Sequence, residues 1–159
     1  MAADADGKSK RVKLRINCAG FQGEAVSVFG MFDKETDVLL IGQKAKKYDT
    51  EPREGFLRIT TQDRDPTNDG VFLEEHTREA IVAFFELEAM NLIQFGEGLS
   101  SLDPKNKIER DGMDTGGMKY RIAPDITNGQ VAVLIAAHTA VKQRNVGAAG
   151  DFFDDLMTI

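Results

Sequence analysis

The chain has 159 residues, of which 42% are hydrophobic and 29% charged, and its formal net charge is −6. This length and composition are typical of one folded domain with a core of its own. No run approaches the roughly 20 apolar residues of a membrane helix, and the N-terminus lacks the basic and then apolar order of a secretory signal. We therefore expect a cytoplasmic protein. The single cysteine, Cys18, excludes an internal disulfide and a cysteine-rich zinc site.

The charge is unevenly distributed along the chain. Residues 1–60 contain eleven cations and nine acids, whereas residues 61–159 contain nine cations and seventeen acids. Such asymmetry is typical of proteins that bind polyanions or that carry an acidic tail. The alternative is that the charges of both halves are ordinary solvated surface. The placement of the cations along the predicted elements distinguishes this alternative from polyanion binding.

The first half of the chain predicts an antiparallel meander of about four strands. Residues 1–10 are small and polar and are interpreted as a mobile N-terminal arm. From Arg11 to Cys18 apolar and polar residues alternate strictly, which indicates a strand with one buried and one solvent-facing side. Further strands, separated by polar turns, are expected over residues 24–32, 38–41 and 56–61.

Two helices are expected in the second half. Thr77 is the predicted N-cap of the first helix, which extends to about Phe95. The apolar stripe of this helix is wide, which indicates deep burial or a contact between subunits, and we therefore expect a homo-oligomer. The second helix begins with a capping box, in which Thr127 and Gln130 each satisfy the other's backbone N–H, and it ends near Asn145.

These elements predict a single α+β domain over residues 11–146. In this domain an antiparallel β-meander has two main helices packed on one face, and a β-hairpin over residues 108–122 lies between the helices. Residues 147–159 begin with small residues and then interleave acids with large apolar side chains, which we interpret as a flexible acidic C-terminal tail. The tail residues expected to bind a partner are Asp151, Phe152, Phe153, Asp154 and Asp155.

Motifs for catalysis and for metal binding are scarce. His138 lies on an apolar helical face, where a core histidine is the favoured interpretation, and an enzyme would need distant acids to converge on His138 or His76. Asp65, Thr67 and Asp69 have the spacing of the first ligands of an EF-hand, but its twelfth position is His76 instead of a carboxylate, so a polar turn is favoured. We expect no catalytic residue, no metal and no cofactor.

The solvent-facing sides of the predicted strands carry the remaining signal. If they share one face of the sheet, that face interleaves cations with aromatic rings. Single-stranded nucleic acid needs this mixture, because cations replace the counterions of the phosphates and rings stack on unpaired bases. In the alternative the cations are ordinary surface and the phenylalanines are core, since a shift of one residue would return Phe29 to the interior. The predicted nucleic-acid-binding residues are Arg11, Lys13, Arg15, Phe29, Lys44, Lys46, Tyr48, Phe56 and Arg58.

The order of the elements and the segment Asp151-Phe152-Phe153-Asp154-Asp155 resemble small single-stranded-DNA-binding proteins of bacteriophages, in particular the type that acts as a cofactor of a phage RNA polymerase. The resemblance implies largely sequence-independent binding of single-stranded DNA in the host cytoplasm. It also implies that the tail supports viral transcription or replication by recruiting RNA polymerase or replication proteins. The alternative from another class is a viral structural or assembly protein whose tail docks on a neighbouring subunit.

Overall fold

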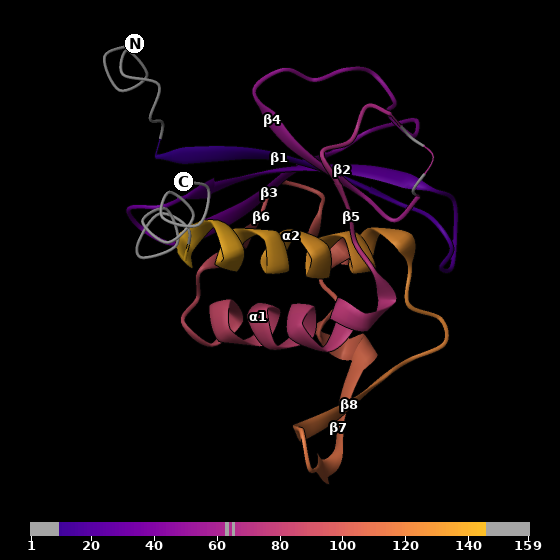
Figure 1. The fold of residues 1–159 in the computed structure, drawn as a ribbon, viewed down its shortest axis with the longest axis vertical. Coiled ribbons are helices and arrows are strands. Elements are labelled where there is room, and N and C mark those ends of the chain that lie inside the picture. The colour runs from indigo at the N-terminus through magenta and orange to yellow at the C-terminus, as the bar shows by residue number, and fades with distance from the viewer. Residues whose placement is uncertain (1–9, 63, 65, 146–159) are drawn as a thin grey trace, which may run out of the picture.

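The computed structural model describes residues 10–62, 64 and 66–145 and has an α+β fold. Six strands form one mixed sheet in the order β5-β4-β1-β2-β3-β6, and β7 and β8 form a separate hairpin (Figure 1). The acidic tail, with Asp151, Phe152, Phe153, Asp154 and Asp155, and the N-terminal arm except Lys10 lie outside the described residues. The strands are β1 (Arg11–Cys18), β2 (Val26–Asp33), β3 (Val38–Lys44), β4 (Phe56–Thr60), β5 (Gly70–Val71), β6 (Ile93–Phe95), β7 (Ile108–Asp114) and β8 (Gly117–Ile122), and the helices are α1 (Thr77–Ala89) and α2 (Asn128–Asn145).

Strand β1 has the bounds and the buried side that its alternation predicts. Leu14, Ile16 and Cys18 are fully buried on the face of the sheet that α2 covers. Burial raises the pKa of the Cys18 thiol to about 12, so this cysteine is a packed side chain and not a reactive thiolate. The intervening polar residues of β1 lie on the opposite face of the sheet, which we call the open face.

The antiparallel meander holds for the first three strands only. Strand β2 pairs antiparallel with both β1 and β3, but β4 pairs parallel with β1, with Lys13 opposite Phe56. The prediction of a fourth meander strand was therefore wrong. A parallel pair needs a crossover connection, and residues 45–55 provide it by passing over the open face to the far side of β1.

Helix α1 is shorter than predicted. It ends at Ala89, and Asn91 then adopts a left-handed conformation with φ of 57°, which ends a helix because it reverses the backbone turn. The next residues form β6, which pairs parallel with β3 at the edge of the sheet. Thr77 is also not the N-cap, because the cap position is His76, which makes no side-chain capping bond.

The start of α2 is as predicted. The side-chain oxygen of Gln130 accepts a hydrogen bond from the N–H of Thr127 at 3.0 Å, and the hydroxyl of Thr127 accepts one from the N–H of Gln130 at 3.1 Å. Two of the N–H groups that a helix start leaves without a partner are thereby satisfied. The helix continues to Asn145, which is the last described residue.

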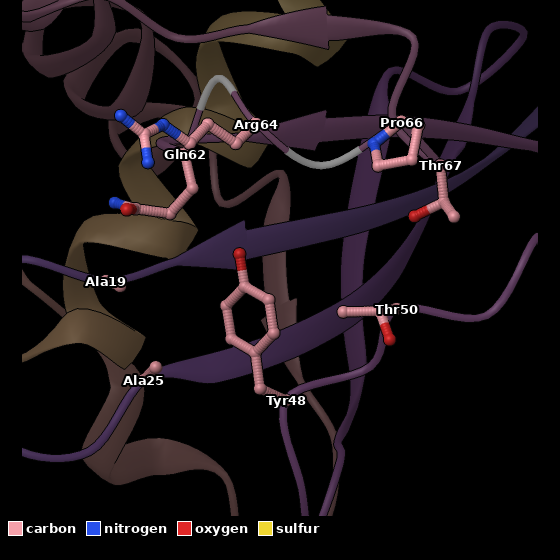
Figure 2. A pocket seen from close by; sticks show the side chains of 8 residues that line it. All are labelled: Ala19, Ala25, Tyr48, Thr50, Gln62, Arg64, Pro66 and Thr67. Carbon is pink, nitrogen blue, oxygen red and sulfur yellow. The ribbon is translucent and has the colours of Figure 1, made fainter.

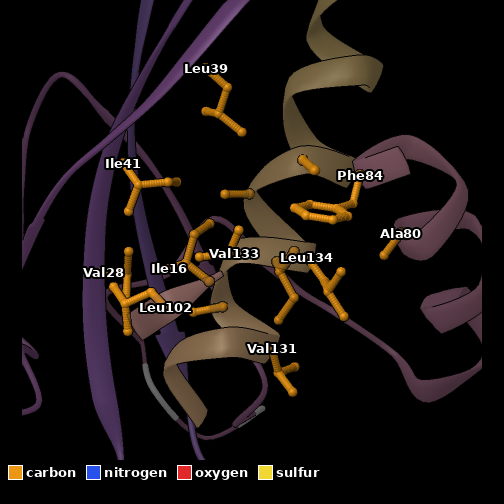
Figure 3. Close-up of a cluster of buried hydrophobic side chains, with 14 of the residues drawn as sticks. Ile16, Val28, Leu39, Ile41, Ala80, Phe84, Leu102, Val131, Val133 and Leu134 are labelled. Carbon is orange, nitrogen blue, oxygen red and sulfur yellow. The ribbon is translucent and has the colours of Figure 1, made fainter. Parts of the chain in front are cut away.

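The core lies between the sheet and the two helices, which stack on one side of it. Helix α2 packs on β1, β2 and β3, and α1 packs on the far side of α2 (Figures 1 and 3). Because α2 is the middle layer, its residues are buried from Asn128 to Ala140. The side chains that fill this core include Ile16, Val28, Leu39, Ile41, Ala80, Phe84, Leu102, Val131, Val133 and Leu134.

The wide apolar stripe of α1 is covered partly by the chain itself. Phe84 is buried, and the ring of Phe85 stacks on Tyr120 of the β7–β8 hairpin with centroids 6.0 Å apart. Val82 and Met90 are about half exposed, at 49% and 53%. The homo-oligomer therefore stays a prediction. Within the part of the chain that the structure describes, no helix is long and apolar enough to cross a bilayer.

Helix packing brings together the two histidines, which are distant in sequence. The rings of His76 and His138 stack with centroids 5.9 Å apart, and Phe72 packs edge-on against His138 at 5.5 Å. His138 is a buried residue, as predicted, and its Nε2 lies 3.4 Å from a carboxylate oxygen of Glu79. Burial lowers the pKa of His138, and the hydrogen bond with Glu79 opposes this effect only in part.

We expect the free energy of unfolding to decrease as the pH falls through the titration range of His138. A histidine whose pKa is lowered in the folded state favours folding above its ordinary pKa, and this contribution is lost when the folded form becomes protonated. Lowering the pH from about 8 to about 5 should therefore reduce the free energy of unfolding of the wild type more than that of a His138→Phe variant. Urea denaturation at each pH measures this free energy. Parallel pH dependence of the two proteins would contradict this assignment.

Candidate nucleic-acid interface

The open face of the sheet is divided into a covered half and an exposed half. Residues 45–55 and 66–69 cover Arg15, Asn17 and Ser27, all of which are fully buried. The exposed half holds aromatic and aliphatic side chains and one lysine from the four adjacent strands β4, β1, β2 and β3, namely Lys13, Phe29, Met31, Leu40 and Phe56.

Arg15 lies on the predicted face but is not available to a ligand. Its Nη1 donates to a carboxylate oxygen of Asp49 at 2.8 Å and to the carbonyl of Glu51 at 2.6 Å. Its Nη2 donates to the carbonyl and the hydroxyl of Thr67, at 3.2 and 3.0 Å. A buried guanidinium requires such partners, because desolvating it alone costs several kcal/mol. The prediction that Arg15 contacts phosphate was wrong, and Arg15 instead fastens two loops to the sheet.

Two neutral side chains complete the attachment of the first loop. Asn17 donates from Nδ2 to the carbonyl of Asp49 at 2.8 Å, and the hydroxyl of Ser27 donates to the side-chain oxygen of Asn17 at 2.6 Å. The same hydroxyl accepts from the N–H of Asp49 at 2.7 Å. The backbone N–H, the backbone carbonyl and the carboxylate of Asp49 are therefore all bound, which fixes the segment around this residue.

Asp49 connects the buried Arg15 to a cation at the surface. Arg53 donates from Nε and Nη2 to the two carboxylate oxygens of Asp49, both at 2.9 Å. The hydrogen bonds from Arg53, and then those from Arg15, hold the pKa of Asp49 well below its usual range. The Arg53 side chain is 44% exposed and its guanidinium carbon lies 5.9 Å from the centre of the Phe29 ring. Sequence reasoning missed Arg53, because it lies in a loop where no periodicity indicates a direction.

An aromatic pair occupies the middle of the exposed half. Phe29 on β2 and Phe56 on β4 meet edge to face across β1, with ring centroids 5.8 Å apart and an interplanar angle of 82°. The ammonium of Lys13 lies 5.7 Å from the centre of the Phe56 ring. Phe29 therefore has the outward direction that the predicted register required.

Two adjoining hollows surround this pair. They have volumes of about 280 and 620 Å³ and share Phe29, Gln43 and Phe56. The smaller hollow opens over the sheet beside Lys13, and the larger one extends under the start of the crossover, where it is lined by Lys46, Lys47 and Arg53. We call the combined surface the open-face site, and it consists of Lys13, Phe29, Lys46, Lys47, Arg53 and Phe56.

Lys44 points away from this site. The pairing of β2 with β3 shifts between Phe29 and Gly30, so that Gly42 forms a bulge and Lys44 lies opposite Val28. Residues paired in a ladder share a face of the sheet, and Val28 faces the helices. The prediction that Lys44 belongs to the cationic face was therefore wrong, because one extra residue in β3 reverses the alternation.

Arg58, Tyr48 and Arg11 lie at the margins of the open face. Arg58 donates from Nε and Nη2 to the carboxylate of Asp69, at 3.1 and 3.0 Å, and its pairing occupies the edge of the sheet beside β5. Tyr48 lines a separate hollow with residues that include Gln62, Arg64 and Pro66 (Figure 2). Arg11 is exposed on the same face as Lys13, one step nearer the strand end. Of the predicted residues, the structure thus brings together Lys13, Phe29, Lys46 and Phe56.

Two of the residues with EF-hand-like spacing, Thr67 and Asp69, have other partners, and Asp65 lies outside the described residues. Asp69 holds Arg58, and Thr67 accepts hydrogen bonds from Arg15. Among the described residues, no group of three or more His, Cys, Asp or Glu side chains is arranged to hold a metal ion.

Comparisons with protein-family models, with curated proteins and with solved structures give no match to the chain. The geometry and the charges of the open-face site are therefore the basis for assigning a function.

We expect the Asp49→Ala substitution to destabilise the protein by about 3 kcal/mol. It would leave the buried guanidinium of Arg15 without its carboxylate and would detach the crossover. Glu35→Ala is the matched control, because Glu35 pairs with Lys10 in an exposed ion pair, and such pairs contribute about 0–1 kcal/mol. Equal losses for the two variants in urea denaturation would show that the buried network is not a main support of the fold.

Proposed function

We propose that this protein binds single-stranded DNA on the open-face site, with little dependence on base sequence. The observation that carries the proposal is the edge-to-face pair of Phe29 and Phe56, which lies outside the core and is flanked by the cations of Lys13 and Arg53. Aromatic rings on a sheet face offer stacking surfaces to unpaired bases, and adjacent cations replace the counterions of the phosphates.

A single strand suits this surface better than a duplex does. Recognition of a duplex commonly places a helix in the major groove, but α2 is the buried middle layer. The outer helix α1 has acidic residues in its exposed positions, among them Glu79 and Glu86. A duplex also keeps its base faces stacked inside, so the rings of Phe29 and Phe56 would have nothing to stack on.

The acidic tail extends the proposal to a role in viral transcription or replication. Its residues Phe152 and Phe153 lie between acids, as in the phage proteins that the sequence resembles. In this role the open-face site holds the single strand in the host cytoplasm while the tail recruits RNA polymerase or a replication protein. The net charge of −6 opposes indiscriminate association with polyanions.

The Phe29→Ala and Phe56→Ala variants should each bind a labelled oligonucleotide about 1–3 kcal/mol more weakly than the wild type, because each loses a stacking surface. Fluorescence anisotropy measures the affinity. Phe29→Leu, which keeps apolar bulk without a ring, should show a similar loss. Phe21→Ala is the matched control, because Phe21 is 45% exposed but lies beside the start of α2. Unchanged binding by Phe29→Ala and Phe56→Ala would contradict the proposed stacking.

The affinity should decrease steeply with salt concentration, and Lys13→Ala and Lys46→Ala should each reduce this dependence. Each phosphate contact contributes about 0.7 to the slope of log affinity against log salt for a single strand. Lys119→Ala, which removes an exposed cation from the β7–β8 hairpin, should leave the slope unchanged.

Equal slopes for all four proteins would exclude these phosphate contacts. An absence of binding at low salt, together with a mass that grows with protein concentration, would favour the structural or assembly protein instead.

A further inference from the structure

We infer that the hollow around Tyr48 is a second base-binding subsite, which receives an unpaired nucleobase from the same strand that occupies the open-face site. The inference rests on the proposed function and adds to it a course for the strand, across residues 45–50. It also assigns Tyr48 a nucleic-acid-binding role, as the sequence predicts, at a place separate from the pair of Phe29 and Phe56.

The Tyr48 hollow has the size and the lining of a nucleobase site. Its volume is about 560 Å³. The ring of Tyr48 rises into the middle of it, with Gln62 and Arg64 on one side and Pro66 and Thr67 on the other (Figure 2). Ala19, Ala25 and Thr50, which have small side chains, complete the lining.

The two sites share a wall. Lys46, Lys47 and Asp49 line the larger hollow of the open-face site, whereas Tyr48 and Thr50 line the Tyr48 hollow. Residues 46–50 thus separate the two hollows, and a strand held by the two lysines needs only to pass over them to reach Tyr48. Asp49 is fixed to β1 and β2 through Asn17 and Ser27, so the spacing of the two sites is rigid.

The chemistry of the Tyr48 hollow suits an unpaired base. The hydroxyl of Tyr48 lies 3.3 Å from the hydroxyl oxygen of Thr60, which holds the ring in place for stacking. Gln62 presents an amide, and Arg64 a guanidinium, both of which bind the edges of splayed bases.

The test is the dependence of affinity on oligonucleotide length, measured with oligothymidylates of about 4 to about 16 nucleotides. For the wild type, affinity should increase in a step once the strand is long enough to reach both sites. Tyr48→Ala should bind the shortest oligonucleotides as the wild type does and should lose about tenfold in affinity for the longest. Tyr48→Phe is the matched control, because it keeps the ring and should retain the step.

An equal loss at every length, or no loss at any length, would overturn the second subsite while leaving the open-face site intact. If the wild type binds no oligothymidylate, the proposed function itself fails, and this result is distinct from the two others.

Photochemical cross-linking provides a measurement that does not depend on the folding of a variant. A long oligonucleotide carrying 5-iodouracil should form an adduct with Tyr48 of the wild-type protein, located by mass spectrometry of peptides. Adducts confined to Phe29 and Phe56 would overturn the inference.

Discussion

The buried ion pair of Arg15 with Asp49 is the interaction on which the rest of the open face depends. A guanidinium with no exposed surface is stable only with several acceptors around it, and here the acceptors come from two loops, through Asp49, Glu51 and Thr67. Satisfying one buried charge therefore fixes the course of both loops over the sheet. Replacing a buried pair by apolar residues is often neutral for stability, so the pair is better explained by the shape it imposes than by the energy it contributes.

This constraint divides a single strand face into three environments. Lys13, Arg15 and Asn17 alternate along β1 and point the same way. Lys13 lies over the half-buried ring of Phe56, Arg15 is the centre of a charged cluster, and Asn17 holds a loop backbone. The boundary between the half-buried rings and the covered polar network thus falls within two residues of one strand. Phe29 lies at this boundary. The loop that Arg15 fastens also carries Arg53, and the guanidinium of Arg53 packs on the ring of Phe29.

The features that were predicted correctly depend on residues close together in the sequence. The bounds of β1 follow from strict alternation, and the start of α2 follows from Thr127 and Gln130, three positions apart. Apart from the N-cap of α1, which is His76 and not Thr77, the errors concern long-range placement. Alternation gives the face on which Arg15 lies but not the loop that covers this face, and the apolar residues 93–95 extend a helical pattern although they pair with β3. The bulge at Gly42 changes the direction of every later residue in β3, and a glycine within a strand is only a weak local signal of a bulge.

The distribution of charge favours a binding mode in which stacking contributes much of the affinity. Two of the cations nearest the aromatic pair, Arg15 and Arg53, share the carboxylate of Asp49, so their charge is partly neutralised before any phosphate arrives. The protein as a whole carries a charge of −6 and repels a polyanion at long range. A duplex offers the protein mainly phosphates, so it would be repelled without gaining stacking contacts that offset the repulsion. A single strand also offers base faces to Phe29 and Phe56, and this contact is screened little by salt and costs the protein no further charge. Selectivity for unpaired strands can thus arise from a modest cationic rim on an acidic protein, because only the unpaired form gains the stacking.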